Sequence, residues 1–192
     1  SITLLKLILF GLIFIGIGMI VIGYVISNDI IKKAHNSSLE MEEHTLASNY
    51  LIMIAYNFQQ LVSNFTTNSA KELSDLCLKF QNLVTNLYNS AKDKGGNEYE
   101  IWRDSEKINL RVFSEFGKET NRTSSLYEAL MAYIEHCNTL LSLKLDLLKN
   151  PQILNDPEFK FIMVNGPTVL SSAFDDVAIE IFNNDINYGN RL

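Results

Sequence analysis

The feature that most constrains this chain is the apolar run at residues 7–26, in which every side chain is apolar or small and none is charged. As a helix rising about 1.5 Å per residue, the run spans about 30 Å, the thickness of a bilayer's hydrocarbon core. Residues 26–29, Ile-Ser-Asn-Asp, lack the small-residue exit of a cleaved secretory signal. The sequence therefore predicts an uncleaved membrane anchor and juxtamembrane segment at residues 1–35, followed by a domain at residues 36–192. The alternative, a buried core helix, would need an unusually large surrounding shell.

Four glycines in this run are candidate helix-packing positions. Gly11 and Gly18 are seven residues apart, and so are Gly16 and Gly23. Small residues let helix backbones approach closely in lipid, but glycine is also common in membrane helices in general. Both interpretations stay open, helix association and simple membrane composition. The lack of charged side chains argues against an ion or proton pathway through this helix alone.

Flanking charges bear on orientation and on partners. Lys6 precedes the run, and Lys32 and Lys33 follow it, so the positive-inside rule leans toward a cytoplasmic domain. Lys6 is the one basic residue before residue 28, which leaves 15 basic against 22 acidic residues for the rest. That balance excludes a nucleic-acid surface, which needs a basic patch. We expect a single-pass membrane protein in direct contact with the lipid bilayer.

Beyond the run, apolar residues recur with the three- and four-residue spacing of helices. S-x-x-E capping boxes begin at Ser37, Ser69 and Ser125; the first fits inside a helix that continues out of the membrane, and the other two predict helix starts. Gly95 and Pro151 predict helix ends. The periodic segments are residues 38–66, 69–94, a weaker helix at 108–117, 125–148, a turn opening at 156–157 and, after a break at 165–167, a helix from 169 to 182. Because each helix has one apolar face and loops are short, we expect an all-α fold, an antiparallel bundle of about four long helices.

Residues that carry chemistry are few. Glu40 and His44 are four apart and share a helix face, but two ligands make no metal site, and a solvated face is the favoured interpretation. Asp175 and Asp176 are expected at a solvated edge, and Trp102 is expected to pack in the core or next to the membrane. No catalytic, cofactor-binding or metal-binding residue is predicted. The sequence therefore favours a protein that is not an enzyme and needs no cofactor.

The two cysteines, Cys77 and Cys137, both lie on apolar stripes. Free thiols pack as small hydrophobic groups, so two reduced core thiols are predicted. The alternative is a disulfide between helices, which would form only in an oxidising compartment. His136 precedes Cys137 directly, but adjacent helical residues point about 100° apart, so no catalytic Cys–His pair is implied.

Two segments near the end of the chain resemble motifs of the LemA family. Residues 150–159, Asn-Pro-Gln-Ile-Leu-Asn-Asp-Pro-Glu-Phe, are similar to that family's Y-P-x-L-x-x-x-x-x-F segment. Residues 182–188, Phe-Asn-Asn-Asp-Ile-Asn-Tyr, are similar to its F-Y-N-x-x-V-x-x-Y-N close, whereas residues 52–57 replace its I-P-N-L stretch. The resemblance implies a membrane-anchored antiparallel helical bundle with no established catalytic activity, and it carries over no active-site residues.

Three functions are open at this point. The leading hypothesis is a structural, assembly or scaffold subunit of a membrane complex, whose partners are other membrane-protein subunits or further copies of this chain. The second is a sensor or ligand-binding helical module, the plan of chemoreceptor ligand domains, which also have a second membrane helix and an output domain. The third is a pilin-like filament subunit, against which stands Leu5, where bacterial pilins carry a glutamate.

Overall fold

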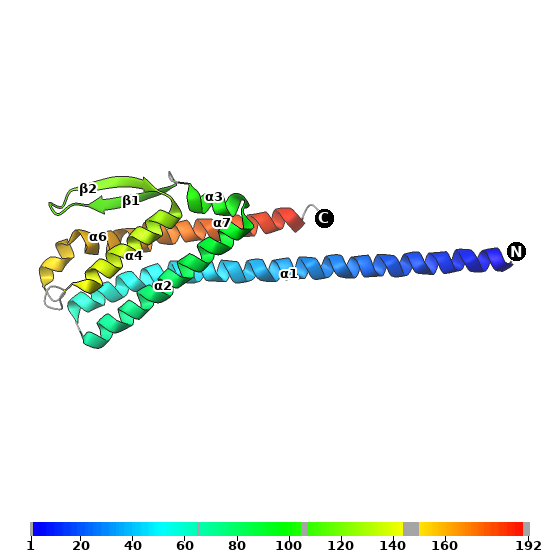
Figure 1. Ribbon diagram of the computed structural model, residues 1–192, viewed down its shortest axis with the longest axis horizontal. Coiled ribbons are helices and arrows are strands. Elements are labelled where there is room, and N and C mark those ends of the chain that lie inside the picture. Colours follow the sequence, from blue (N-terminus) through cyan, green and yellow to red (C-terminus); the bar gives the residue numbers. More distant parts are fainter. Residues whose placement is uncertain (1, 65, 105–106, 144–149, 190–192) are drawn as a thin grey trace.

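The structure is a computed structural model that describes residues 2–64, 66–104, 107–143 and 150–189. It is mostly α-helical, as predicted, and a two-stranded hairpin is the one sheet within these ranges. One helix, α1, projects far beyond the rest, and the other elements gather beside its C-terminal half (Figure 1). The hairpin makes the expectation of an all-α fold wrong in that one region.

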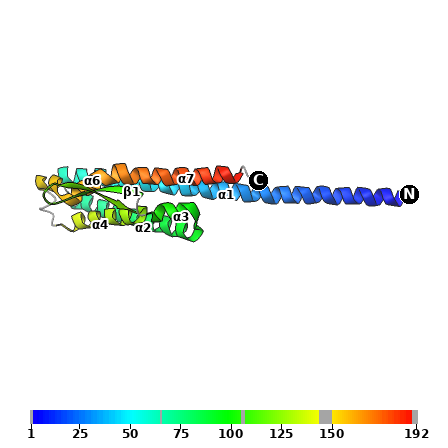
Figure 2. The ribbon, with the colours of Figure 1, turned by 90° about the horizontal axis from the view of Figure 1, so that it is seen from above.

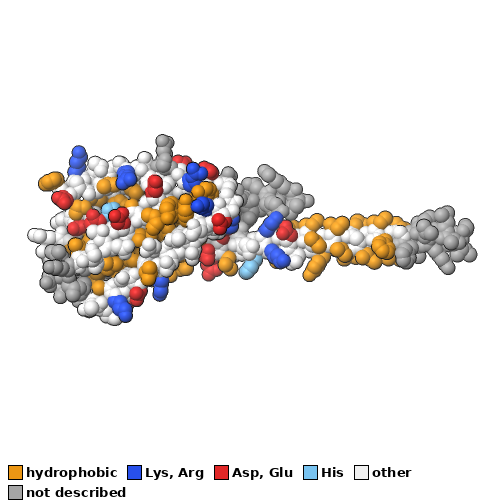
Figure 3. Space-filling model, viewed as in Figure 1, with side chains coloured by type: hydrophobic (Ala, Val, Ile, Leu, Met, Phe, Trp, Pro, Cys, Tyr) orange, Lys and Arg blue, Asp and Glu red, His pale blue; other side chains and the backbone are white. Residues whose placement is uncertain are grey.

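Helix α1 runs without interruption from Ile2 to Ser63. Its 62 residues extend about 93 Å at the usual rise per residue. Within the described residues it is the one helix long and apolar enough to cross a membrane, and its most apolar stretch is not buried at all. Figure 3 shows hydrophobic side chains along this projecting part. The predicted domain boundary after residue 35 therefore falls inside a continuous helix, as does the capping box at Ser37.

The second half of α1 belongs to the hydrophobic core. Two long helices pack along it, α2 (Thr67–Lys94) and α7 (Ser171–Gly189). Helix α7 runs antiparallel to α1, so its C-terminal end points back toward the apolar part of α1 (Figures 1 and 2). The buried apolar residues of α1 recur at helical spacing and are Ala47, Leu51, Ile54, Ala55, Phe58 and Leu61.

Helix α2 begins earlier than the sequence predicts. Thr66 is its N-cap: the Thr66 side chain accepts a hydrogen bond from the Ser69 N–H at 3.0 Å, and Ser69 Oγ accepts one from the Thr66 N–H at 3.0 Å. Ser69 is thus the last residue of a capping box rather than the first, because a threonine hydroxyl caps as a serine does. The predicted end at Gly95 is confirmed. Gly95 and Gly96 have φ of +66° and +75°, which lets the chain turn directly into α3 (Gly96–Arg103).

The hairpin replaces the weak helix predicted at residues 108–117. Strands β1 (Ile108–Phe113) and β2 (Glu119–Ser124) pair antiparallel, with Ile108 opposite Ser124. Ile108 and Leu110 alternate inward, whereas Phe116, which falls within the predicted helix, is 95% exposed in the turn. Gly117 takes φ +75° there, a conformation that closes a turn and ends a helix. The β-branched and aromatic residues of β1 then favour a strand.

Helix α4 (Leu126–Ser142) begins as predicted, with Ser125 and Glu128 forming the capping box. It ends before Leu143, short of the predicted residue 148; residues 144–149 lie outside the described residues. A 3-10 turn, η1 (Pro151–Asn155), follows. Helix α6 (Pro157–Val164) then starts at the predicted position, capped by Asp156.

The break predicted at residues 165–167 is instead a π-helical segment, η2 (Asn165–Leu170), which joins α6 to α7. Pro167 has no N–H to donate, and a π-type turn absorbs such an interruption. A Cβ on Gly166 would lie 2.6 Å from the Tyr133 hydroxyl oxygen, so glycine is required at this close approach. The Asn165 amide accepts a hydrogen bond from the Arg111 N–H at 2.9 Å and donates one to the Arg111 carbonyl at 2.8 Å. The segment thereby fastens the hairpin to the core.

Candidate functional site

Polar side chains gather where α1 enters the helical domain. Glu40 and His44 lie one turn apart on α1, Glu98 and Trp102 lie one turn apart on α3, and Lys94 ends α2. We call these five residues the His44 cluster. Lys94 forms an ion pair with Glu40 and lies 4.0 Å from the Glu98 carboxylate. Glu40 and His44 on α1 therefore face Glu98 and Trp102 on α3, and Lys94 at the end of α2 lies between the two carboxylates.

The side chain of His44 is fully buried. Its Nδ1 lies 2.8 Å from the carbonyl oxygen of Glu40, so Nδ1 carries the proton and Nε2 is an acceptor. The rings of Trp102 and Phe174 meet the imidazole edge-on, at 6.3 and 6.0 Å between centroids. Burial lowers the pKa of His44, and the nearby Glu40 only partly opposes this. The predicted solvated face is therefore wrong for His44, because α3 and α7 cover this turn of α1.

Two carboxyl groups in the cluster share one ammonium group. The side chains of Glu40 and Glu98 are each 12% exposed, whereas that of Lys94 is 49% exposed. Burial, and after it the negative charge of Glu40, raises the pKa of Glu98 to about 7, with Lys94 acting in the opposite direction. Glu98 therefore changes its charge in the neutral pH range.

Buried polar atoms without a hydrogen-bond partner are concentrated in this cluster. Among the described residues, the three such side-chain atoms are His44 Nε2, Glu98 Oε1 and Trp102 Nε1. The imidazole nitrogen accepts, the indole N–H donates, and the Glu98 carboxyl does either according to its protonation. Leaving a buried polar group without a partner costs about 1–3 kcal/mol. Such atoms are uncommon in folded proteins, so their concentration here marks the His44 cluster as the candidate functional site.

Further aromatic rings pack next to Trp102. The ring of Tyr88 on α2 stacks on that of Tyr127 on α4 at 4.0 Å and meets the rings of Trp102 and Tyr99, both at 6.0 Å. A hydrogen bond with Tyr99 raises the pKa of Tyr88. Trp102 itself is fully buried, so the prediction that it packs in the core is confirmed.

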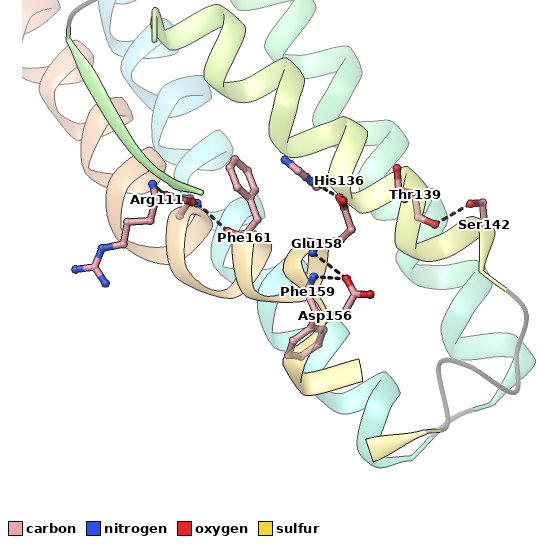
Figure 4. Close-up of polar contacts among 9 residues, drawn as sticks. Arg111, His136, Thr139, Ser142, Asp156, Glu158, Phe159 and Phe161 are labelled. Carbon is pink, nitrogen blue, oxygen red and sulfur yellow. Dashed lines mark hydrogen bonds and ion pairs between the residues drawn. The ribbon is translucent and has the colours of Figure 1, made fainter. Parts of the chain in front are cut away.

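A second polar group lies at the far end of α4 (Figure 4). His136 pairs through Nδ1 with the Glu158 carboxylate, and its ring lies 3.8 Å from that of Phe161. Asp156 caps α6 by accepting hydrogen bonds from the N–H groups of Glu158 and Phe159. The His136 contacts connect α4 to α6, the Asp156 cap fixes the start of α6, and we assign both a structural role.

The two cysteines lie where the sequence predicts. Cys77 and Cys137 are 3% and 1% exposed, and both are free thiols. Burial, followed by a hydrogen bond with Cys77, raises the pKa of Cys137, so the two thiols meet between α2 and α4. In the part of the chain that the structure describes, no three His, Cys, Asp or Glu side chains are placed to hold a metal ion. Asp175 and Asp176 are exposed, as expected.

The candidate helix-packing glycines lie apart from every other element of this chain. A Cβ added at Gly11, Gly16, Gly18 or Gly23 would meet no atom within 4 Å. The structure therefore brings none of them into contact with another helix of the same molecule. Their packing role stays a prediction, and it concerns a partner in the membrane.

Comparisons with protein-family models, with curated proteins and with solved structures find no match to this chain. The resemblance to the LemA family therefore stays a prediction. The sequence singles out Glu40 and His44 but gives Glu98 and Lys94 no role. The signal for Glu98 is local: it lies four residues before Trp102 and two after Gly96, so the side chains of Glu98 and Trp102 share one face of a short helix.

Proposed function

We propose that this chain is a non-enzymatic, single-pass membrane protein whose residues 36–192 form an antiparallel bundle of about four long helices, acting as an assembly or scaffold subunit. The observation that carries the proposal is the apolar part of α1. Its large hydrophobic side chains from Leu12 to Ile26 are 44% to 73% exposed. Burying each such side chain is worth about 1.5–3 kcal/mol, so this stretch needs cover from lipid or from a partner helix. The lysines at 32 and 33 favour a cytoplasmic domain.

One face of α1 supports self-association as the form of assembly. Leu39, Leu46 and Met53 are 51%, 43% and 47% exposed and recur every seven residues, which places them along one side of α1. Gly11 and Gly18 continue the same seven-residue register into the apolar run. We call these five residues the exposed seam. A membrane anchor holds two copies parallel, which lets the seam of one copy face the seam of the other.

The other glycine pair, Gly16 and Gly23, lies on a different side of α1 from the exposed seam. At about 100° per residue, Gly18 lies about 60° around the axis from Leu39, whereas Gly23 lies about 160° away. Gly23 lies 21 residues before His44, which is three steps of seven residues, and His44 is buried inside the domain. The two glycine pairs therefore make different predictions for association through the exposed seam.

Leucine substitutions in the two glycine pairs test association through the exposed seam. Gly11→Leu with Gly18→Leu inserts bulk where two backbones meet and should reduce the mass of the complex in mild detergent, measured by light scattering with detergent correction. Gly16→Leu with Gly23→Leu changes the other candidate pair, which lies outside the exposed seam. Association through the seam predicts no loss of mass in this variant, whereas packing through Gly16 and Gly23 predicts a loss. Both variants raise hydrophobicity, so membrane insertion is retained in each. A wild-type chain that is monomeric, or an equal loss in both variants, would contradict association through the seam.

A sensor module is the second candidate function, and the continuity of α1 favours it. One helix links the apolar stretch to core residues such as Leu51 and Phe58, and α7 returns beside it. A displacement at either end is then carried along a single rigid element. Ile31→Pro interrupts that element and separates the candidates. A scaffold that associates through the exposed seam loses complex size in this variant, because residue 31 lies between Gly18 and Leu39, whereas a sensor keeps its size and loses the coupling between its domain and its anchor.

A further inference from the structure

Helix α3 is a short element that packs against α2, α4 and α7 and meets α1 through a few side chains. The Gly95–Gly96 corner joins it to α2. It docks by burying Ile101 and Trp102, which are 8% and 0% exposed. The Glu98 carboxylate of α3 lies beside the ion pair between Lys94 and Glu40. The side chains of the His44 cluster therefore make the contact between this corner and α1.

The charge of this cluster depends on one proton. Two carboxylates and one ammonium are neutral together only when one carboxyl group is protonated. The charged groups that face Glu98 are Glu40 from α1 and Lys94 from α2. His44, on the next turn of α1, is kept neutral by burial, and α7 contributes the apolar ring of Phe174. Loss of the proton leaves two negative charges sharing a single positive one in a mostly buried site, and this weakens the contact.

We propose that Glu40, Lys94 and Glu98 form a proton-operated latch that holds α3 on α1 when Glu98 is protonated and loosens this corner when Glu98 is ionised. The pKa of Glu98, raised to about 7, puts the change in the neutral range. The protonated form also has an O–H to donate, which the carboxylate lacks, and the Glu40 carboxylate is within hydrogen-bonding reach of Glu98. Because Glu40 lies on α1, the latch connects pH to the helix that carries the apolar stretch.

The chain contains a built-in reporter of this latch. Trp102 is its single tryptophan, is fully buried and packs against His44. We would measure quenching of its fluorescence by acrylamide, an uncharged quencher, in the full chain in detergent micelles from about pH 5.5 to 8.5. The quenching constant should be low in acid and rise with a midpoint near pH 7. Far-UV circular dichroism at both ends of the range should show an unchanged helical domain.

Single substitutions test which side chains determine the pH midpoint of Trp102 quenching. Glu98→Gln should abolish the rise and keep Trp102 protected, because the amide is neutral throughout. Glu40→Gln removes the neighbouring negative charge and should lower the midpoint by about one pH unit, whereas Lys94→Met should raise it by a similar amount. Glu100→Gln, at an exposed position of the same helix, is the matched control and should leave the midpoint unchanged.

Several results would overturn the latch. A flat wild-type profile would do so, and so would a Glu98→Gln profile identical to that of the wild type. If Glu98→Gln fails the circular dichroism check, the opposite shifts of Glu40→Gln and Lys94→Met decide the question, and shifts in one direction refute the proposal. A transition that disappears in His44→Gln but persists in Glu98→Gln would assign the titration to the imidazole and refute it as well.

Discussion

Replacing Gly166 by alanine should destabilise the domain by about 1–3 kcal/mol, the usual cost of overpacking a core. The added Cβ would lie 2.6, 2.8 and 2.9 Å from the Oη, Cε2 and Cζ atoms of Tyr133, well inside contact distance. Tyr133 has little freedom to move away. It is fully buried, its ring meets that of Phe80 at 6.2 Å, and its hydroxyl donates to the Leu51 carbonyl at 3.4 Å. Relief of the clash therefore disturbs the packing of α4 against both α1 and α2.

Urea unfolding followed by Trp102 fluorescence measures this cost. The midpoint for Gly166→Ala should fall while the slope stays constant, the sign of lost stability without a change in the unfolded state. In a Tyr133→Phe background the closest contact is gone, so the alanine penalty should shrink, and a double-mutant cycle gives the coupling. Gly16→Ala, where a Cβ meets nothing within 4 Å, is the control. A wild-type midpoint for Gly166→Ala would refute the close approach of the π-helical segment to α4.

Three further predictions concern stability and access. Asn165→Ala removes both side-chain hydrogen bonds to the Arg111 backbone and should cost about 1–3 kcal/mol in urea unfolding. Asn165→Asp should cost more, because its carboxylate would face the Arg111 and Phe161 carbonyl oxygens in a fully buried site. A wild-type midpoint in both variants would contradict this attachment of the hairpin. Alkylation of Cys77 and Cys137 should be slow in the native chain and fast in urea. Labelling blocked in urea until reductant is added would instead reveal a disulfide. Folding raises the pKa of Glu98 from 4.5 to about 7, so between these pH values the folded chain keeps a proton that the unfolded chain has released. The free energy of unfolding should therefore fall by up to about 3 kcal/mol as pH rises from 4.5 to about 7. Glu98→Gln should remove that slope.

The helical part of the fold is largely predictable from the sequence because its signals are local. The Ser125 capping box and the Asp156-Pro157 start both depend on residues within one turn, and both are confirmed. The hairpin is not predictable in this way. In β1 only Ile108 and Leu110 alternate clearly into the core, and β2 buries Ser124 alone. The position of the hairpin depends on pairing between its strands and on packing against the core, and the spacing of apolar residues along one segment carries no signal for either.

The π-helical segment and the His44 cluster depend on residues far apart in the chain. Asn165-Gly166-Pro167 has the composition of a break, and it stays helical because Tyr133 and Arg111 complete its packing and hydrogen bonding. The spacing of Glu40 and His44 is predictable, but the environment of His44 is not. The rings that bury it come from α3 and α7, far from it in sequence.

Membrane anchoring by α1 is tested most directly by flotation after an alkaline carbonate wash. The full chain, synthesised in the presence of lipid vesicles, should float with the membranes. Ile17→Arg with Ile20→Arg places two charges at the centre of the run, each costing about 2.5–3.5 kcal/mol there, and should move the chain to the soluble fraction with its helical circular dichroism intact. Ser27→Arg with Asn28→Arg, beyond the run, is the matched control and should still float. A wild-type chain extracted by carbonate, or a double-arginine variant that stays embedded, would contradict the anchor.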